Sequence, residues 1–438
     1  MGESTRSSRG PTRSRVALAG ACAVLVATVL AGCSSTNTSG TGSSGSGEPA
    51  IPSSAFSDHT GVTSSSVTIA NVSTLVAGLF KGGAVGTEAY AAYVNSQGGV
   101  HGRKLVVQST DDAFQGAINK QLTTAAFGQA FALVGGVSLE DNFGGTVLEA
   151  NPQFPNVSES LDPKTEALPN TFSAIPAGKG WPLGPLDYFK ATFPTKIKHT
   201  ATIIANLPST ETAWSQEKAT MEHLGYQVLY DPALPPSQTD FTQQVVAMKN
   251  AGVQILFLEQ EPENYASSIF KDLTQQNFHP TVVLGAPAYN ETLVANSGGP
   301  SAVDGAYLEQ SAALYLGEDA ASIPAVSTFD TWVHTVDPTF TPDYFTFLGW
   351  LSAELFTQAL RNAGTDPSRG SLLQALRHVT SFSSGKLAPV TNPAGKVPTG
   401  CFLLGQITDG RFQRLDNPPI DGPTGGFRCD KPYYVPPS

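Results

Sequence analysis

The sequence is poor in the residues on which catalytic and metal-binding motifs depend. Only four of its 438 residues are cysteine and seven are histidine. No Cys-x-x-Cys pair, His-Glu-x-x-His motif or Gly-x-Ser-x-Gly turn occurs, and no phosphate-binding Walker loop follows an expected strand. We therefore expect no catalytic residues, no metal site and no cofactor, and a protein that is not an enzyme.

Positive charge is scarce as well. The chain has 25 Lys and Arg against 36 Asp and Glu, which gives a net charge of −11. Four of the basic residues and one acidic residue precede Cys33, so the remainder carries a net charge of −14. An acidic surface repels phosphate groups, which argues against nucleic acid as a partner and against adsorption to anionic lipid.

The N-terminal segment has the pattern of an export signal. Four arginines precede an uncharged run over 16–30, which is shorter than the ~20 residues of a membrane-spanning helix. Two small residues and Cys33 follow, and the resulting Leu-Ala-Gly-Cys resembles the lipobox of bacterial lipoproteins. The resemblance implies a signal peptide over 1–32 and a diacylglycerol on Cys33. The alternative is an ordinary secretory signal or an uncleaved anchor with a chance cysteine.

A polar segment follows this cysteine. Residues 34–66 are mostly Ser, Gly and Thr, so they bury too little apolar surface to offset the loss of chain entropy. We expect residues 33–66 to form a disordered, lipid-anchored linker that spans roughly 30 Å as a random coil. The folded part would then be tethered to the outer face of the cell membrane by its lipid alone and remain mobile over it.

The remaining cysteines predict one disulfide. Cys22 leaves with the signal peptide and Cys33 is lipidated, so only Cys401 and Cys429 remain in the folded part. Because an exported protein folds in an oxidising compartment, we expect these two to pair.

From about residue 67 onwards, strand-like and helix-like segments alternate. In the first half we expect strands at 66–72, within 97–112, at 131–136 and at 153–158, and helices at 86–96 and 118–129. In the second half we expect strands at 200–206, 226–231, 253–259 and 280–286, and helices at 212–224, 240–251 and 264–276. An extended segment at 305–315 and a long helix at 343–362 follow. Such alternation predicts βαβ units and parallel sheets covered on both faces.

This order predicts an α/β protein of two doubly wound parallel-sheet lobes, joined by a multi-strand hinge because late elements return. We place one lobe at 67–175 plus 309–390, and the other at 176–308 plus 391–438. Proteins of this architecture bind small molecules in the crevice at the carboxyl ends of their strands.

Several stretches resemble a known family. AYAAYVNSQGGVHGRKLVVQSTDDA (89–113), FALVGGVS (131–138), PNVSESLDP (155–163) and DFTQQVVAMKNAGVQILFL (240–258) are similar to type I periplasmic solute-binding proteins. More narrowly, they resemble the leucine-binding-protein-like group that binds branched-chain amino acids and amides for ABC importers. The shared motifs are structural, and they say little about the ligand.

The resemblance implies that one end of the ligand binds in the first lobe. Ser138 follows a strand that ends at Gly135-Gly136 and precedes an expected helix at 141–150, and a helix start offers free N–H groups to a carboxylate or amide oxygen. In the family the matching serine binds the ligand carboxylate, and a second loop, here Ser158 to Ser160, binds it too. The alternative is that Ser138 only caps the helix.

The second lobe departs from the family. Thr210 stands where amino-acid binders carry a tyrosine, and Pro287 stands near the position of the acid that pairs with the ligand ammonium. The candidate ligand-binding residues of this lobe are Thr210, Trp214, Glu261 and Tyr289. The alternatives are that Glu261 belongs to a solvated acidic loop and that the aromatic residues pack in the interior.

Together these features predict an extracytoplasmic, lipid-anchored, monomeric receptor. It would bind a small polar ligand, an amino acid, an amide or a small carboxylate, and deliver it to an ABC permease complex. A sensor that passes a ligand signal to another membrane protein is the first alternative, and a secreted hydrolase is the second.

Overall fold

A computed structural model describes residues 49–429, 431 and 433–435. The expected signal peptide, Cys33 and the first part of the expected linker lie outside the described residues. Within the described ranges, no helix combines the length and apolar character needed to cross a membrane.

The first sheet has four parallel strands in the order β2-β1-β3-β4. We call this sheet and its helices lobe 1. Its strands are β1 (Ser66–Ser73), β2 (Lys104–Asp111), β3 (Ala132–Val134) and β4 (Asn156–Val157). Its helices are α1 (Lys81–Ser96), α2 (Gly116–Gln129), α3 (Asp141–Ala150), α4 (Pro163–Ala167), α11 (Pro324–Val336), α12 (Tyr344–Asn362) and α13 (Arg369–Leu376).

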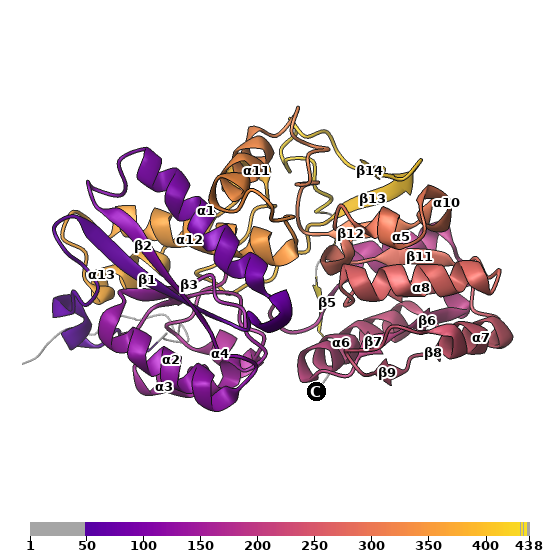
Figure 1. The fold of residues 1–438 in the computed structure, drawn as a ribbon, viewed down its shortest axis with the longest axis horizontal. Helices are drawn as coiled ribbons and strands as arrows, with labels where there is room; N and C mark the ends of the chain where they lie inside the picture. The colour runs from indigo at the N-terminus through magenta and orange to yellow at the C-terminus, as the bar shows by residue number, and fades with distance from the viewer. Residues whose placement is uncertain (1–48, 430, 432, 436–438) are drawn as a thin grey trace, which may run out of the picture. The chain divides into compact units, whose positions relative to one another are not determined.

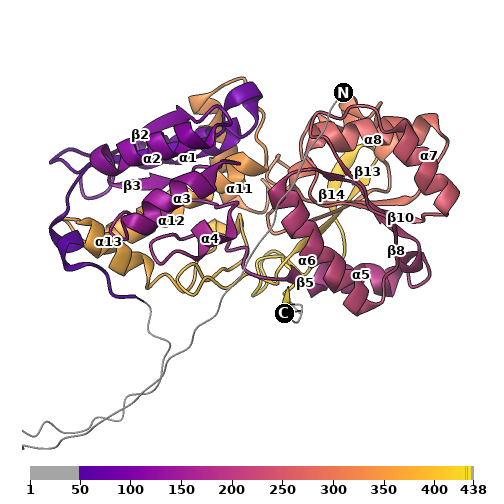
Figure 2. The same cartoon turned by 90° about the horizontal axis from the view of Figure 1, so that it is seen from below.

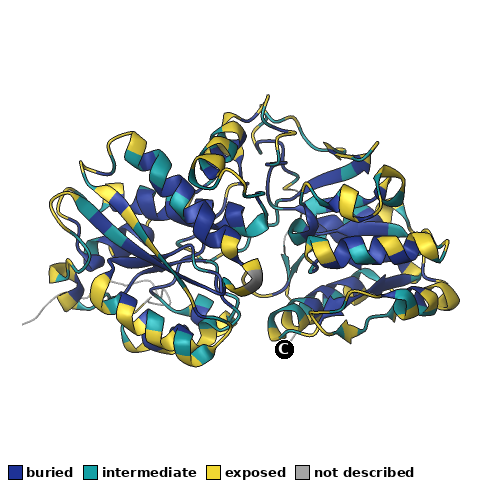
Figure 3. Cartoon of the chain, viewed as in Figure 1, coloured by how far each residue is buried: buried dark blue, intermediate teal, exposed yellow. Residues whose placement is uncertain are grey.

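Successive side chains of β1 point to opposite faces of this sheet, and both faces are covered by helices. Val67 and Ile69 are buried in the apolar cluster that includes α1 and α12, whereas Ala70 and Val72 are buried in the cluster that includes α2 and α3. Helices α1 and α12 accordingly lie over one face and α2 and α3 over the other (Figure 1). The buried strands run between helices whose outer faces are exposed (Figure 3).

Glycine allows α1 and α12 to pack closely. A Cβ atom at Gly86 would overlap the carbonyl oxygen of Thr346, and one at Gly349 would overlap that of Gly83. Asp343 caps helix α12, and its carboxylate accepts a hydrogen bond from the Thr346 N–H at 2.8 Å in a capping box. The helix expected at 343–362 is therefore confirmed.

The second sheet has seven strands in the order β14-β13-β12-β11-β10-β6-β8. We call this sheet and its helices lobe 2. Its strands are β6 (Thr200–Thr202), β8 (Val228–Tyr230), β10 (Ile255–Leu258), β11 (Thr281–Leu284), β12 (Tyr307–Gln310), β13 (Leu403–Thr408) and β14 (Arg411–Arg414). Its helices are α5 (Leu183–Thr192), α6 (Pro208–Leu224), α7 (Thr242–Ala251), α8 (Glu263–Gln275), α9 (Leu293–Asn296) and α10 (Pro300–Val303). Two further pairs are β5 (Trp181–Pro182) with β15 (Tyr433–Tyr434), and β7 (Ile204–Ala205) with β9 (Ala233–Leu234).

The α/β fold with parallel sheets is confirmed, and its later elements return as expected. Strands β6, β8, β10, β11 and β12 are parallel, while β13 and β14 form an antiparallel hairpin that the sequence analysis did not predict. The chain passes between the sheets after α4, after β12 and before β13 (Figure 2). Because β12 belongs to the second sheet through Gln310, the expected boundary at 309 falls inside a strand.

The expected linker is wrong over its described part. Ser53–Ser57 form a short 3-10 helix that packs on α13, with Ala55 completely buried. The Asp58 carboxylate pairs with the Arg369 guanidinium at 2.9 Å, and Arg369 is 1% exposed. An ion pair with the buried Arg369 and a few apolar side chains thus order a segment whose composition alone indicated disorder.

Candidate functional site

The three serines expected to bind ligand in lobe 1 line one pocket. Ser138 follows β3, while Ser158 and Ser160 follow β4, so parallel strands bring them to the same edge of the sheet. Glu159 and residues of β1, β3, β4, α2, α3 and α4 also line it. Burial, together with repulsion from Glu166, raises the pKa of Glu159 to about 8.

The Ser138 hydroxyl is occupied by neighbours inside the lobe. It donates to the carboxylate of Asp112 and accepts from the Asn119 side chain at 3.1 Å and from the Thr74 hydroxyl at 3.3 Å. It also accepts from the Glu140 N–H at 2.9 Å, just before α3 begins. Since a hydroxyl has one proton to donate, this arrangement leaves none for a ligand oxygen. The ligand role of Ser138 stays a prediction.

Carboxylates of the protein also occupy backbone donors near this pocket. Asp141 accepts from the Leu161 N–H at 2.7 Å and from the Asp162 N–H at 3.2 Å. Burial raises the pKa of Asp141 to about 7, although these two hydrogen bonds lower it. The Ser158 hydroxyl accepts from the Gly136 N–H at 3.1 Å. Two carboxyl groups of the protein, those of Asp141 and Glu159, thus line the pocket, and binding of a ligand carboxylate there stays a prediction.

In lobe 2 the structure brings Thr210 and Glu261 together around Ala205. The Thr210 hydroxyl donates to the backbone carbonyl oxygens of Ala205 and Leu207, five and three residues earlier in the chain. The Glu261 side chain accepts from the Ala205 N–H at 2.9 Å, and its second carboxylate oxygen is buried without a hydrogen-bond partner. Burial raises the pKa of Glu261 to about 7. Glu261 is thus buried, and the alternative of a solvated loop is wrong for this residue.

Trp214 and Tyr289 pack in the interior. Trp214 is 6% exposed in the cluster beneath α5 and α6, and its indole N–H donates to Asp231 at 3.2 Å. Tyr289 is completely buried between the rings of Tyr315 and Phe412, and its hydroxyl donates to Glu318. Trp214 lies one helical turn after Thr210 on α6, and both aromatic residues are held by contacts inside the protein, so their ligand roles stay predictions.

Three glutamates, the buried Glu217 and Glu259 and the half-buried Glu309, form a group that was not predicted from the sequence. Glu217 lies on α6, Glu259 follows β10, and Glu309 lies in β12. Burial, together with repulsion from Glu309, raises the pKa of Glu217 to about 8. Burial also raises the pKa of Glu309 to about 7 and that of Glu259 well above its usual range. These three residues, which lie up to 92 positions apart in the sequence, meet only through the order of the strands.

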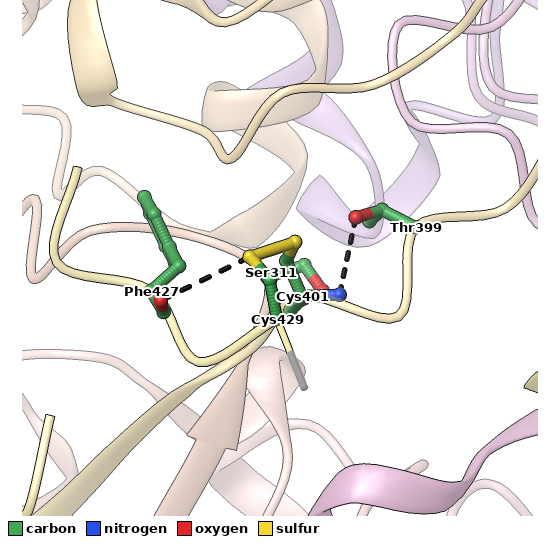
Figure 4. Close-up of a disulfide and its surroundings, with 5 residues drawn as sticks. All are labelled: Ser311, Thr399, Cys401, Phe427 and Cys429. Atoms are coloured by element: carbon green, nitrogen blue, oxygen red, sulfur yellow. Dashed lines mark hydrogen bonds between the residues drawn. A yellow bond between two sulfur atoms is a disulfide. The ribbon is translucent and has the colours of Figure 1, made fainter. Parts of the chain in front are cut away.

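A disulfide joins the segment just before β13 to the C-terminal segment of the chain. Cys401 and Cys429 are bonded, which confirms the expected pair (Figure 4). The bond holds the chain ahead of β13 next to the C-terminal segment, where Phe402 and Arg428 form a β-bridge. That segment continues into β15, whose Tyr434 pairs with Trp181 of β5. In the parts of the chain that the structure describes, no group of acidic, histidine and cysteine side chains could hold a metal ion.

Comparison with known proteins assigns the family. A model of the periplasmic binding proteins matches residues 68–411. No curated protein matches the chain. A fatty acid ABC transporter substrate-binding protein from Thermomonospora curvata is 16% identical, with a TM-score of 0.67, over 86% of this chain and 95% of its own.

Two further solved structures share the fold. A branched-chain amino acid ABC transporter protein from Thermus thermophilus with bound valine is 15% identical, with a TM-score of 0.67, over 81% of this chain and 96% of its own. A solute-binding protein of an ABC transporter from R. palustris, in complex with benzoate, is 18% identical, with a TM-score of 0.65, over 85% of this chain and 98% of its own. The family match covers most of both sheets, and the chain therefore belongs to the periplasmic binding protein family, with the type I fold.

Proposed function

We propose that this protein is an extracytoplasmic, lipid-anchored receptor that captures a small polar solute between its lobes and delivers it to an ABC permease complex. The family match over residues 68–411 carries the proposal, because it includes most of both sheets and the passes of the chain between them. The neighbours described with valine and with benzoate bind small organic molecules on the same fold. An amino acid, an amide or a small carboxylate fits this size class.

The proposed mechanism is closure of the two lobes around the solute. The three passes of the chain would absorb the rotation, as hinges do. Closure is favoured only by contacts made in the closed state, so side chains from both lobes must touch the solute. The edges of the sheets that carry Ser160 and Glu261 are the proposed contact surfaces, and the receptor acts as a monomer without a catalytic step.

The test is a ligand screen on the purified mature protein. A panel of amino acids, amides and carboxylates is added, and the melting temperature is measured for each, because a solute that binds only the folded state raises it. Small-angle X-ray scattering with the best solute should then show a smaller radius of gyration, and mass spectrometry should recover the solute unchanged. Chemical turnover of the solute, or a melting temperature that no member of the panel raises, would contradict the proposal.

A further inference from the structure

The glutamates of lobe 2 are held at one level of the sheet by strand register. Leu258, Leu284 and Leu308 are aligned on β10, β11 and β12. The next residue of each strand is Glu259, Gly285 or Glu309, so the two acids flank a glycine on the intervening strand.

Side-chain alternation places both acids on the same face. Phe257, Val283 and Tyr307 lie two residues earlier on the three strands and pack in the cluster with α5 and α6. Residues two apart on a strand share a face, so Glu259 and Glu309 point toward α6, which carries Glu217. Leu404, the partner of Glu309 on β13, belongs to the same cluster.

These buried polar groups are not satisfied within lobe 2. Glu259 is 5% exposed, and neither of its carboxylate oxygens has a hydrogen-bond partner. Glu217 is 1% exposed and has one such oxygen, while the buried indole N–H of Trp181 lacks an acceptor. Trp181 and Glu309 lie near enough to Glu259 to affect its pKa, yet neither forms a hydrogen bond of ordinary geometry with it.

A buried carboxylate without a partner lowers the stability of the folded protein. Such groups are kept where a ligand can supply the compensating positive charge. Among the ion pairs found in residues 49–429, 431 and 433–435, none includes Glu217, Glu259 or Glu309. The three do not converge as metal ligands. Burial raises the pKa of the Tyr344 and Tyr433 hydroxyls, and the charges of Glu159 and Glu309 raise both further, so both hydroxyls lie within electrostatic range of Glu309.

Carboxylates beside aromatic rings recognise organic cations by ion pairing and by cation–π attraction. We propose that the solute carries a cationic nitrogen, and that Glu259 and Glu309 bind it beside Glu217 and Trp181. The inference rests on the proposed receptor function and names the charge of its ligand. It excludes purely anionic solutes, although it admits zwitterionic amino acids.

The test uses probes that match in shape and differ in charge. The mature protein is titrated with 1,4-diaminobutane, 1,4-butanediol and butanedioate, and with choline, 3,3-dimethylbutan-1-ol and 3,3-dimethylbutanoate. Leucine and 4-methylpentanoate form a third series. The melting temperature and the Kd are measured for each, and at least one nitrogen-bearing cation should raise the melting temperature while its neutral and anionic counterparts do not.

Variants show where the charge is bound. Glu309→Gln and Glu259→Gln keep the side-chain shape, and each should weaken binding of the cationic probe about tenfold or more, as expected for a hydrogen bond to a charged group. Glu149→Gln on the exposed side of α3 is the matched control and should leave the Kd unchanged. The empty Glu259→Gln variant should melt no lower than the wild type, because neither oxygen of the carboxylate that it replaces has a hydrogen-bond partner.

Three results would overturn the inference. The first is binding of a neutral or anionic probe as tight as that of its cationic counterpart, which leaves the receptor function intact. The second is an unchanged Kd in both Gln variants. The third is a lower melting temperature of the empty Glu259→Gln variant, which would make that acid structural. Failure of every probe, whatever its charge, would contradict the receptor function together with this inference.

Discussion

The Ser138 hydroxyl donates its proton to the Asp112 carboxylate, and the two side chains are 2% and 0% exposed. Asn119 also donates to this carboxylate, at 2.9 Å, so a closed network lies where the sequence predicted a ligand contact. The pocket edge of lobe 1 is therefore held together by its own polar groups.

Ser138→Ala should lower the free energy of unfolding by about 1–3 kcal/mol, because it removes a donor from a buried carboxylate. Urea unfolding measures the loss, with Ser96→Ala at an exposed position as a control that should change stability by less than about 0.5 kcal/mol. An unchanged free energy of unfolding together with weaker solute binding would show that the hydroxyl serves the ligand instead.

Gly86→Ala should destabilise the protein by about 1–3 kcal/mol or more, because the added methyl group overlaps the Thr346 carbonyl and forces α1 away from α12. Thermal unfolding measures the change. Gly128→Ala in α2 is the matched control, since a Cβ there meets no atom within 4 Å. The control should gain up to about 1 kcal/mol from helix propensity, and equal effects at the two positions would contradict the close packing.

Replacing both Cys401 and Cys429 by serine should cost about 3–4 kcal/mol, because the bond closes a loop of 28 residues in the unfolded chain. Thiol labelling of the native mature protein should detect no free thiol before reduction and two afterwards. Two reactive thiols in native, unreduced protein would show that the bond does not form.

Stability of the empty protein should fall as the pH rises from about 5 to about 8. Burial raises the pKa of Asp141 and Glu261 to about 7 and that of Glu159 to about 8, from ordinary values of 3.8 for Asp and 4.5 for Glu. The folded state thus binds more protons than the unfolded state, and the stability contributed by these groups is present below pH ~4 and lost as the pH passes their folded pKa values.

Glu261→Gln isolates one of these groups. Glutamine retains the oxygen that accepts from the Ala205 N–H and removes the charge from the unpartnered oxygen. The melting temperature of the variant should exceed that of the wild type at pH 8 and approach it at pH 5. The same difference at both pH values would contradict titration of Glu261.

Cys33→Ala should abolish lipid attachment, so that the protein is released or remains an unprocessed precursor. Membrane fractionation and mass spectrometry of the N-terminus measure this. Cys22→Ala, inside the expected signal peptide, should leave attachment intact. A mature, acylated Cys33→Ala protein in the membrane fraction would refute the lipoprotein prediction.

Local sequence patterns determined the succession of strands and helices. The capped start of α12 at Asp343 and the end of α6 at Gly225, in the left-handed conformation, follow from residue types that act within one turn of the chain. The disulfide could be predicted because only two cysteines remain after export. The fold class followed from the alternation of strand-like and helix-like segments. The family followed from structural motifs shared with it.

Tertiary structure decided which side chains meet. Tyr289 was expected to bind ligand and is buried, because Tyr315 and Phe412 arrive beside it from distant segments. Residues 53–58 are ordered because Arg369 of α13 supplies a buried partner for Asp58. Glu259 and Glu309 become neighbours only through the order and register of β10, β11 and β12. Such contacts depend on chain segments tens to hundreds of residues apart, and local propensity contains no information about them.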